Sequence, residues 1–158
     1  MLRLSGIAIM LLLLFSSAKV KVVNMAQLQA TAKKTNDTLY VLNFWATWCK
    51  PCVNEMPYFE KSAQQFKDRK VKVVFVSLNS AKELQQVEGF ISAKKVSEVV
   101  LLLSSGNPNV WIDQVDSSWS GAIPATAMYK GGKKVFFREG EFTQAQLDSI
   151  IQTKIKNV

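Results

Sequence analysis

Chemistry in this chain is most readily assigned to its only two cysteines, Cys49 and Cys52, which form a C-x-x-C pair after an apolar stretch. We expect a helix to begin at this pair. The first sulfur then lies near the helix N-terminus, where unpaired backbone N–H groups and the positive end of the helix dipole favour a reactive thiolate. Cys52 follows one turn later, close enough for a disulfide with Cys49, and Pro51 is tolerated in the first turn. The pair is therefore predicted to be a redox-active dithiol that forms a disulfide reversibly.

Three other uses of a C-x-x-C pair fit the sequence less well. Structural zinc needs four ligands, and the chain has no histidine and no third cysteine. Haem attachment needs a histidine directly after the second cysteine, and that residue is Val53. A purely structural disulfide across so short a loop constrains the unfolded chain little. We therefore expect redox chemistry and no metal.

The sequence around the pair resembles the thioredoxin superfamily. Residues Phe44–Cys52 read FWATWCKPC and are followed by Glu55 and Pro57, a motif similar to that of the exported TlpA/ResA-like thiol-disulfide oxidoreductases. A second stretch, residues 121–126 with the sequence GAIPAT, resembles the cis-proline segment of that family. The resemblance implies an α/β, thioredoxin-like fold over residues 19–158. Such a fold has a central mixed β-sheet flanked by helices, here with a helix-strand insertion before the cis-proline strand.

The resemblance also implies roles for the cysteines and for two polar residues. Cys49 corresponds to the attacking thiolate and Cys52 to the residue that resolves the mixed disulfide, so the two form the redox-active disulfide. Glu55, one turn beyond Cys52, matches a glutamate that tunes the cysteines and their proton transfers in ResA-like proteins. A solvated helix carboxylate is the alternative for Glu55. Asn43 stands where cytoplasmic thioredoxins have a buried acid, and it cannot accept a proton.

A binding surface for client proteins is implied beside Cys49. Pro124 is expected to be the cis-proline, which leaves the backbone of Ile123 free to pair with an extended client segment, in the manner of strand addition. Trp48 is expected to shape the surface around the sulfur. The expected partners are therefore client proteins that carry thiols or disulfides.

Hydrophobic patterning predicts the elements that position this site. Continuous apolar character over Leu39–Phe44 fits a buried strand that leads to the cysteines. From Cys52 to Phe66, apolar residues recur at spacings of 4, 3, 4 and 3, which indicates one buried face of a helix. Trp111 and Trp119 either line the active-site surface or pack inside the protein. Alternating elements predict a sheet covered by helices on both faces, with further strands at 20–23, 71–78, 99–103, 125–129 and 134–138 and helices at 25–34, 81–94, within 109–119 and after 143.

The N-terminal segment, residues 1–18, has the pattern of an export signal. Arg3 precedes an apolar run from Leu4 to Phe15, and the small residues that follow suit a signal peptidase. An uncleaved membrane anchor is the alternative, although this run is shorter than the roughly 20 residues of a spanning helix. We expect residues 19–158 to form one domain in the periplasm, or the same domain anchored to the membrane and facing the periplasm.

Charge argues against nucleic acid as a partner. The chain has 20 basic and 12 acidic residues, for a formal net charge of +8. The lysines are scattered, as on solvated faces, and are not interleaved with exposed aromatic residues. No glycine-rich phosphate loop occurs, and we expect no cofactor.

These features together predict an exported thiol-disulfide oxidoreductase that acts as a reductant. Strong oxidants often carry a histidine between the cysteines, whereas Lys50 and Pro51 supply a charge and no histidine. A reductant in an oxidising compartment needs electrons, so we expect a membrane thiol reductase as the donor. Clients in the family include apocytochromes c, which points to cytochrome c biogenesis. We expect the protein to be a monomer.

Two rival functions belong to other classes. A peroxidase of the peroxiredoxin kind needs a Thr-x-x-Cys nucleophile, and Ala46 stands at the threonine position while Thr47 is two residues from Cys49. A non-enzymatic module that binds clients in the groove near Pro124 would not need its thiols.

Overall fold

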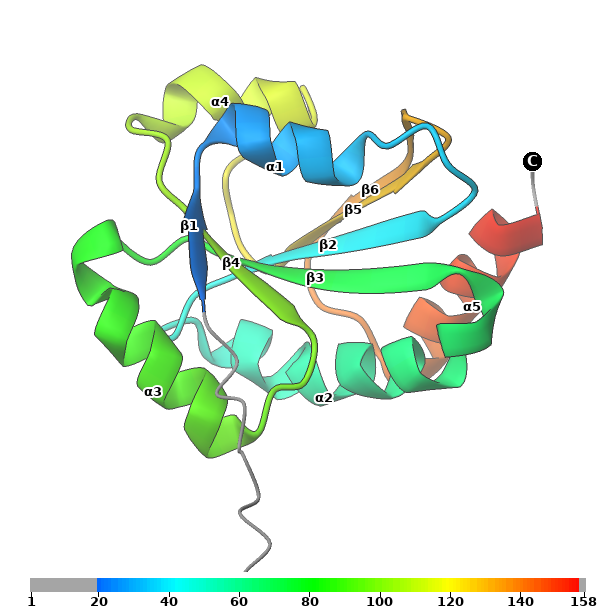
Figure 1. The fold of residues 1–158 in the computed structure, drawn as a ribbon, viewed down its shortest axis with the longest axis horizontal. Helices are drawn as coiled ribbons and strands as arrows, with labels where there is room; N and C mark the ends of the chain where they lie inside the picture. Colours follow the sequence, from blue (N-terminus) through cyan, green and yellow to red (C-terminus); the bar gives the residue numbers. More distant parts are fainter. Residues whose placement is uncertain (1–19, 157–158) are drawn as a thin grey trace, which may run out of the picture.

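A six-stranded mixed sheet organises residues 20–156, the part of the chain described by the structure, which is a computed structural model (Figure 1). The first four strands in the sheet are parallel, and the last two are antiparallel to their neighbours. The predicted signal segment lies outside the described residues. Within those residues, no helix has the length and apolar character needed to cross a bilayer. In sheet order the strands are β1 (Lys21–Val23), β4 (Val99–Leu103), β3 (Val71–Ser77), β2 (Leu39–Trp45), β5 (Ala125–Lys130) and β6 (Lys133–Glu139).

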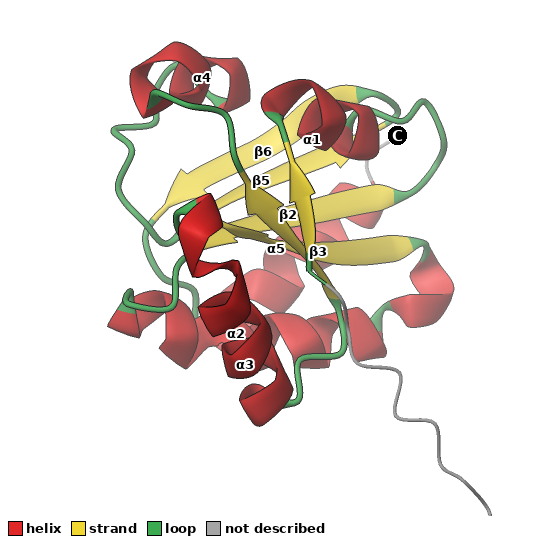
Figure 2. Ribbon diagram, turned by 60° about the vertical axis from the view of Figure 1, so that its left-hand side comes forward, coloured by secondary structure: helices red, strands yellow, loops and turns green. Residues whose placement is uncertain are grey.

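Helices cover both faces of the sheet, which confirms the predicted α/β, thioredoxin-like class (Figures 1 and 2). Each face has its own cluster of buried side chains. Phe59 and Ile91 belong to the cluster on one face, and Leu28 and Trp111 to the cluster on the other. The helices of the first face are α2 (Lys50–Gln65), α3 (Leu84–Lys94) and α5 (Gln144–Lys156), and those of the second are α1 (Met25–Ala32) and α4 (Pro108–Val115).

Strand β2 positions the site because it lies inside the sheet and all of its residues are buried. Successive side chains of a strand point to opposite faces. Leu39, Val41 and Trp45 therefore belong to the cluster that contains α2, whereas Leu42 belongs to the cluster on the side of α1. Asn43 alternates with Leu42, so its amide faces α2.

The predicted elements are present, with differences at their ends. Asn24 caps α1 in a reciprocal capping box with Gln27. The predicted insertion forms the 3-10 helix η2 (Ala81–Glu83), α3 and β4, and β4 lies between β1 and β3. A second 3-10 helix, η1 (Lys67–Arg69), precedes β3. The helix within 109–119 ends at Val115, because Asp116 has an extended backbone.

Candidate active site

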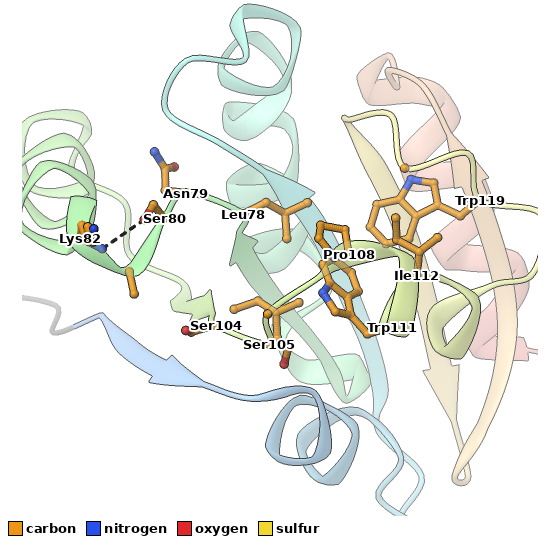
Figure 3. Close-up of a pocket in the computed structure, with 14 residues that line it drawn as sticks. Leu78, Asn79, Ser80, Lys82, Ser104, Ser105, Pro108, Trp111, Ile112 and Trp119 are labelled. Carbon is orange, nitrogen blue, oxygen red and sulfur yellow. Dashed lines mark hydrogen bonds between the residues drawn. The ribbon is translucent and has the colours of Figure 1, made fainter.

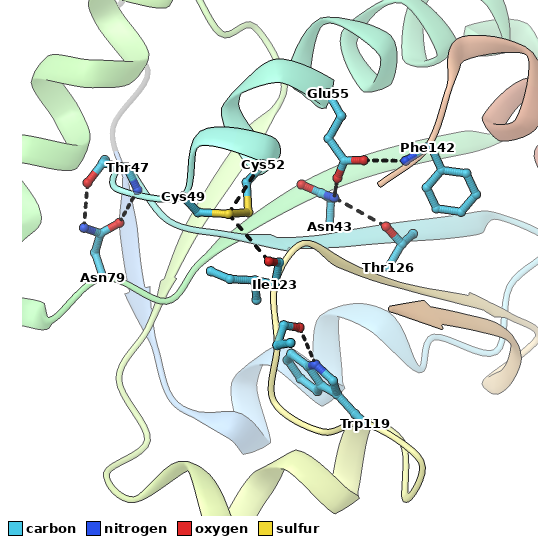
Figure 4. Close-up of a disulfide and its surroundings, with 11 residues drawn as sticks. Asn43, Thr47, Cys49, Cys52, Glu55, Asn79, Trp119, Ile123, Thr126 and Phe142 are labelled. Atoms are coloured by element: carbon cyan, nitrogen blue, oxygen red, sulfur yellow. Dashed lines mark hydrogen bonds between the residues drawn. A yellow bond between two sulfur atoms is a disulfide. The ribbon is translucent and has the colours of Figure 1, made fainter. Parts of the chain in front are cut away.

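The two cysteines lie between the end of β2 and the first turn of α2. Cys49 is the N-cap residue of α2, and its sulfur is bonded to that of Cys52 at 2.09 Å (Figure 4). The backbone nitrogen of Cys52 lies 3.4 Å from Cys49 Sγ, so an N–H group at the helix N-terminus donates toward this sulfur. When the disulfide is reduced, this environment favours the thiolate form of Cys49.

Solvent reaches the two cysteines unequally. Cys49 is 6% exposed, whereas Cys52 is fully buried. A disulfide on another protein can therefore approach Cys49, while Cys52 can attack only from inside the domain. This difference supports the predicted order, in which Cys49 attacks first and Cys52 resolves.

The three predicted binding residues surround Cys49. Trp48 precedes it and is 66% exposed. The carbonyl oxygen of Ile123 lies 3.7 Å from Cys49 Sγ, and the peptide bond between Ile123 and Pro124 is cis. Within residues 20–156, the N–H of Ile123 has no backbone partner. An exposed aromatic ring and an unpaired backbone N–H thus lie on either side of the accessible sulfur in the sequence of the site.

Glu55 is a buried carboxylate, so the solvated-carboxylate interpretation is wrong. The residue is 1% exposed because α2 turns it toward β2 and the segment before α5. Oε1 accepts a hydrogen bond from Asn43 Nδ2, and Oε2 accepts one from the backbone N–H of Phe142, each at 2.8 Å (Figure 4). Glu55 thereby joins α2, β2 and the start of the C-terminal segment.

Burial and hydrogen bonding act on the Glu55 carboxyl in opposite directions. Burial raises the pKa of the Glu55 carboxyl above its ordinary value, and the hydrogen bonds from Phe142 and Asn43 oppose this rise without cancelling it. Two charged neighbours have smaller and opposite effects, since Glu141 raises the pKa and Arg138 lowers it. Glu55 therefore binds a proton more readily than a solvated glutamate does.

Asn79 is a further residue of the site that was not predicted from the sequence. It is 2% exposed and follows β3, which lies beside β2. Its Oδ1 accepts from the Thr47 N–H at 3.0 Å, and its Nδ2 donates to Thr47 Oγ1 at 2.8 Å (Figure 4). Asn79 thus holds the loop that carries Cys49. A polar residue at the carboxyl end of a parallel strand beside the cysteines was the available signal.

A pocket of about 410 Å³ lies beside this loop, at the carboxyl ends of β3 and β4 (Figure 3). Leu78, Trp111 and Trp119 form apolar parts of its wall, and Asn79 and Gly121 also line it. Both tryptophans are buried, at 6% and 4% exposure, so they pack inside the domain and border this pocket. Two lining residues relate the pocket to the site: Asn79 also binds the active-site loop, and Gly121 is two residues before Ile123.

The described residues offer little to a metal ion. No group of three or more His, Cys, Asp or Glu side chains that could hold a metal occurs within residues 20–156. The two sulfurs are bonded to each other, and both oxygens of Glu55 accept hydrogen bonds. These atoms are therefore committed within the protein.

A sheet of this order with a C-x-x-C disulfide at the start of α2 defines a protein of the thioredoxin-like class, which confirms the resemblance seen in the sequence. Residues 16–130 match the model of the AhpC/TSA family, and the chain belongs to that family. A thioredoxin family thiol:disulfide interchange protein from Chlorobium tepidum has a similar structure, with a TM-score of 0.63 at 22% identity over 80% of this chain and 84% of that one.

Named relatives share parts of the sequence. Sporulation thiol-disulfide oxidoreductase A from Bacillus subtilis is 40% identical over 67 residues, which are 42% of this chain and 41% of the relative. Thiol-disulfide oxidoreductase ResA from Bacillus thuringiensis is 28% identical over 114 residues, which are 70% of this chain and 60% of the relative. The chain therefore spans less than two thirds of the length of either relative.

Proposed function

We propose that this protein is an exported thiol-disulfide oxidoreductase that reduces client proteins through Cys49 and Cys52. The observation that carries the proposal is the pairing of an accessible and a buried sulfur at the N-terminus of α2. The exposed Trp48 precedes the accessible sulfur in sequence, and the carbonyl of Ile123 lies beside that sulfur while its N–H is unpaired within residues 20–156. The names of the relatives agree with this activity.

The exchange proceeds in two displacements. The Cys49 thiolate attacks one sulfur of a client disulfide, forms a mixed disulfide and releases the other client sulfur as a thiolate. The Cys52 thiolate then attacks Cys49 Sγ, closes the disulfide seen here and releases the second client thiolate. Two electrons pass from the protein to the client, and the released thiolates take protons from solvent.

Glu55 is proposed to take the proton that Cys52 loses before the second displacement. Cys52 has no contact with bulk water, and Glu55 is a buried carboxylate one turn further along α2. Its raised pKa suits a proton acceptor that must hold a proton transiently. The predicted catalytic set is therefore Cys49, Cys52 and Glu55.

Clients are proposed to bind across Trp48 and Ile123, with the client strand alongside residues 121–123. The pocket bordered by Trp111 and Trp119 includes Gly121 in its lining, and we propose that it takes a client side chain. Apocytochromes c and other exported thiol proteins are the proposed clients. A membrane thiol reductase is the proposed donor that returns Cys49 and Cys52 to the dithiol.

The two rival functions have less support. Thr47 is held by Asn79 in the loop before the cysteines, and Ala46 occupies the position where a peroxidase of the peroxiredoxin kind needs a threonine. A binding module without chemistry would not account for two sulfurs placed at bonding distance with unequal exposure. Peroxide consumption that depends on Cys49, or client binding that survives Cys49→Ser and Cys52→Ser together, would favour the respective rival.

Redox titration of the purified protein against glutathione or dithiothreitol tests the proposed direction. A reduction potential near that of thioredoxin, about −270 mV, supports a reductant. A potential near about −120 mV, typical of a strong oxidant, contradicts it. A protein whose two cysteines do not exchange with either reagent is not an oxidoreductase at all.

A further inference from the structure

The amide of Asn43 is only half satisfied in the buried site. Nδ2 donates to Glu55 Oε1 at 2.8 Å and lies 3.4 Å from Thr126 Oγ1. Oδ1 is buried and has no hydrogen-bond partner within residues 20–156. A buried acceptor without a partner lowers stability, so such atoms are rare. The arrangement is explained if Oδ1 has a partner in another state of the site.

The two donors that face Glu55 define that state. The N–H of Phe142 and Nδ2 of Asn43 both donate to the carboxylate, which suits the ionised form. Once protonated, one carboxyl oxygen must itself donate. Phe142 remains a donor because its N–H belongs to the backbone, whereas the Asn43 side chain can rotate. The added proton is therefore placed on Oε1. There it faces the Asn43 NH₂ group, which is also a donor, unless the amide turns.

We propose that Asn43 is a positioning residue whose amide turns over when Glu55 takes up a proton. In the ionised state Nδ2 donates to Oε1, and in the protonated state Oδ1 takes the place of Nδ2 and accepts the hydrogen on Oε1. Thr126 serves both states, because its hydroxyl can accept from Nδ2 and can donate to Oδ1. The proposal rests on the proposed function only in taking Cys52 as the source of the proton.

The turn links the carboxyl to the cysteines. Figure 4 shows the Asn43 amide between the disulfide and Glu55, with Oδ1 on the side of the cysteines. After the turn, Nδ2 stands on that side and donates toward Cys52. The proton step converts a Cys52 thiol and a Glu55 carboxylate into a thiolate and a carboxylic acid, and no electrons move. The Cys52 thiolate thus gains a hydrogen-bond donor, Nδ2 of Asn43, as its proton leaves.

Charged groups near Glu55 set the pH at which the amide turns. Burial shifts the pKa of Glu55 upward, Glu141 adds to that shift from the segment before α5, and Arg138 on β6 opposes it. Cys52 precedes Glu55 by three residues on α2, and its ionisation is the event to which the turn responds. The turn is therefore expected to be pH-dependent in the reduced protein.

Side-chain NMR of the reduced full chain tests the turn directly. The Glu55 carboxyl carbon reports its protonation, and nuclear Overhauser contacts report the neighbours of the Asn43 NH₂ protons. We expect these contacts to move from the Thr126 methyl group to the Cys52 β-protons as Glu55 gains its proton, with one shared midpoint. Contacts that stay with Thr126 while Glu55 is protonated overturn the proposal.

The variant Glu55→Gln holds the site in the second state. Its side-chain oxygen can accept from Phe142 N–H, and its NH₂ group can donate to Asn43 Oδ1. The Asn43 protons should then face Cys52 at every pH, so contacts with Thr126 in this variant contradict the proposal. Glu60→Gln makes the same change further along α2, and it should keep the wild-type pattern.

A kinetic measurement separates positioning from structure alone. Asn43→Leu removes both hydrogen-bonding atoms, and we expect resolution of a mixed disulfide on Cys49 to slow about tenfold. The hydrogen bond from Asn43 lowers the pKa of Glu55, so the midpoint assigned to Glu55 in the pH profile should also shift upward. An unchanged rate and profile contradict the positioning role. Absence of disulfide exchange in the wild type contradicts the proposed function instead, because the NMR contacts do not depend on exchange.

Discussion

At the scale of single residues, the unequal exposure of the two cysteines leads to the first prediction. Cys52→Ala removes the resolving thiol, so covalent complexes with clients should accumulate through Cys49. Cys49→Ala should accumulate none, because Cys52 is fully buried. Non-reducing gels with mass spectrometry of the trapped partners measure both. Equal trapping by the two variants contradicts the assigned roles.

Glu55 leads to a second prediction at this scale, concerning stability and pH. Its pKa is raised above 4.5 in the folded protein, so above that pH the folded state binds more protons than the unfolded state. The free energy of unfolding of the wild type should therefore fall, relative to Glu55→Gln, as the pH rises from 4.5 through the pKa of the folded state. Urea unfolding of both reduced proteins across this range measures the difference. A constant difference would show that the burial of Glu55 does not affect its titration.

At the scale of elements, Asn79 joins the end of β3 to the loop between β2 and α2. Asn79→Ala removes the two hydrogen bonds to Thr47, which should cost about 1–3 kcal/mol in the free energy of unfolding. The rate of Cys49 alkylation should fall, because a looser loop holds Cys49 less firmly at the N-terminus of α2, which favours its thiolate. Asn79→Asp should recover both properties in part, because a carboxylate accepts from the Thr47 N–H and from its hydroxyl.

The control for this prediction is Asn109→Ala, the same substitution at an exposed position of α4. It should leave the alkylation rate and the free energy of unfolding unchanged. Wild-type alkylation in Asn79→Ala, with the stability loss present, would show that Asn79 supports the fold without positioning Cys49.

At the scale of the whole molecule, the proposed export makes residues 1–18 separate from the domain. We expect protein recovered from the periplasm to begin at Lys19, because small residues precede that position. Intact-mass measurement of the recovered protein checks the cleavage site. Full-length mass in a membrane fraction indicates the anchored alternative, and full-length mass in the cytoplasm contradicts export.

The topology of the sheet explains how residues from distant parts of the sequence meet at the active site. The parallel strands β2, β3 and β4 end at one edge of the sheet, and the cysteines, Asn79 and the pocket all lie at that edge. Segments distant in sequence meet there because the carboxyl ends of parallel strands lie at the same edge of the sheet. The cis-proline segment before β5 completes the site from the antiparallel side.

Local sequence patterns were enough to locate the cysteine pair, the strand that leads to it and the helix that begins there. Those features depend on local spacing and on hydrophobic periodicity, which neighbouring residues express directly. The same local patterns predicted Trp48 and Pro124 through the family motif. They also predicted the buried face of α2, where Cys52, Met56, Phe59 and Ala63 are all buried.

The roles of the polar residues depend on the three-dimensional packing. Glu55 and Asn43 are separated by 12 positions, and Asn79 and Thr47 by 32, so their hydrogen bonds depend on the register of β2 with its neighbours. A glutamate on a helix is ordinarily solvated, and this one is buried because α2 crosses above Asn43 and Phe142 closes the far side. Burial and pairing of this kind arise from packing between distant segments, which no local pattern encodes.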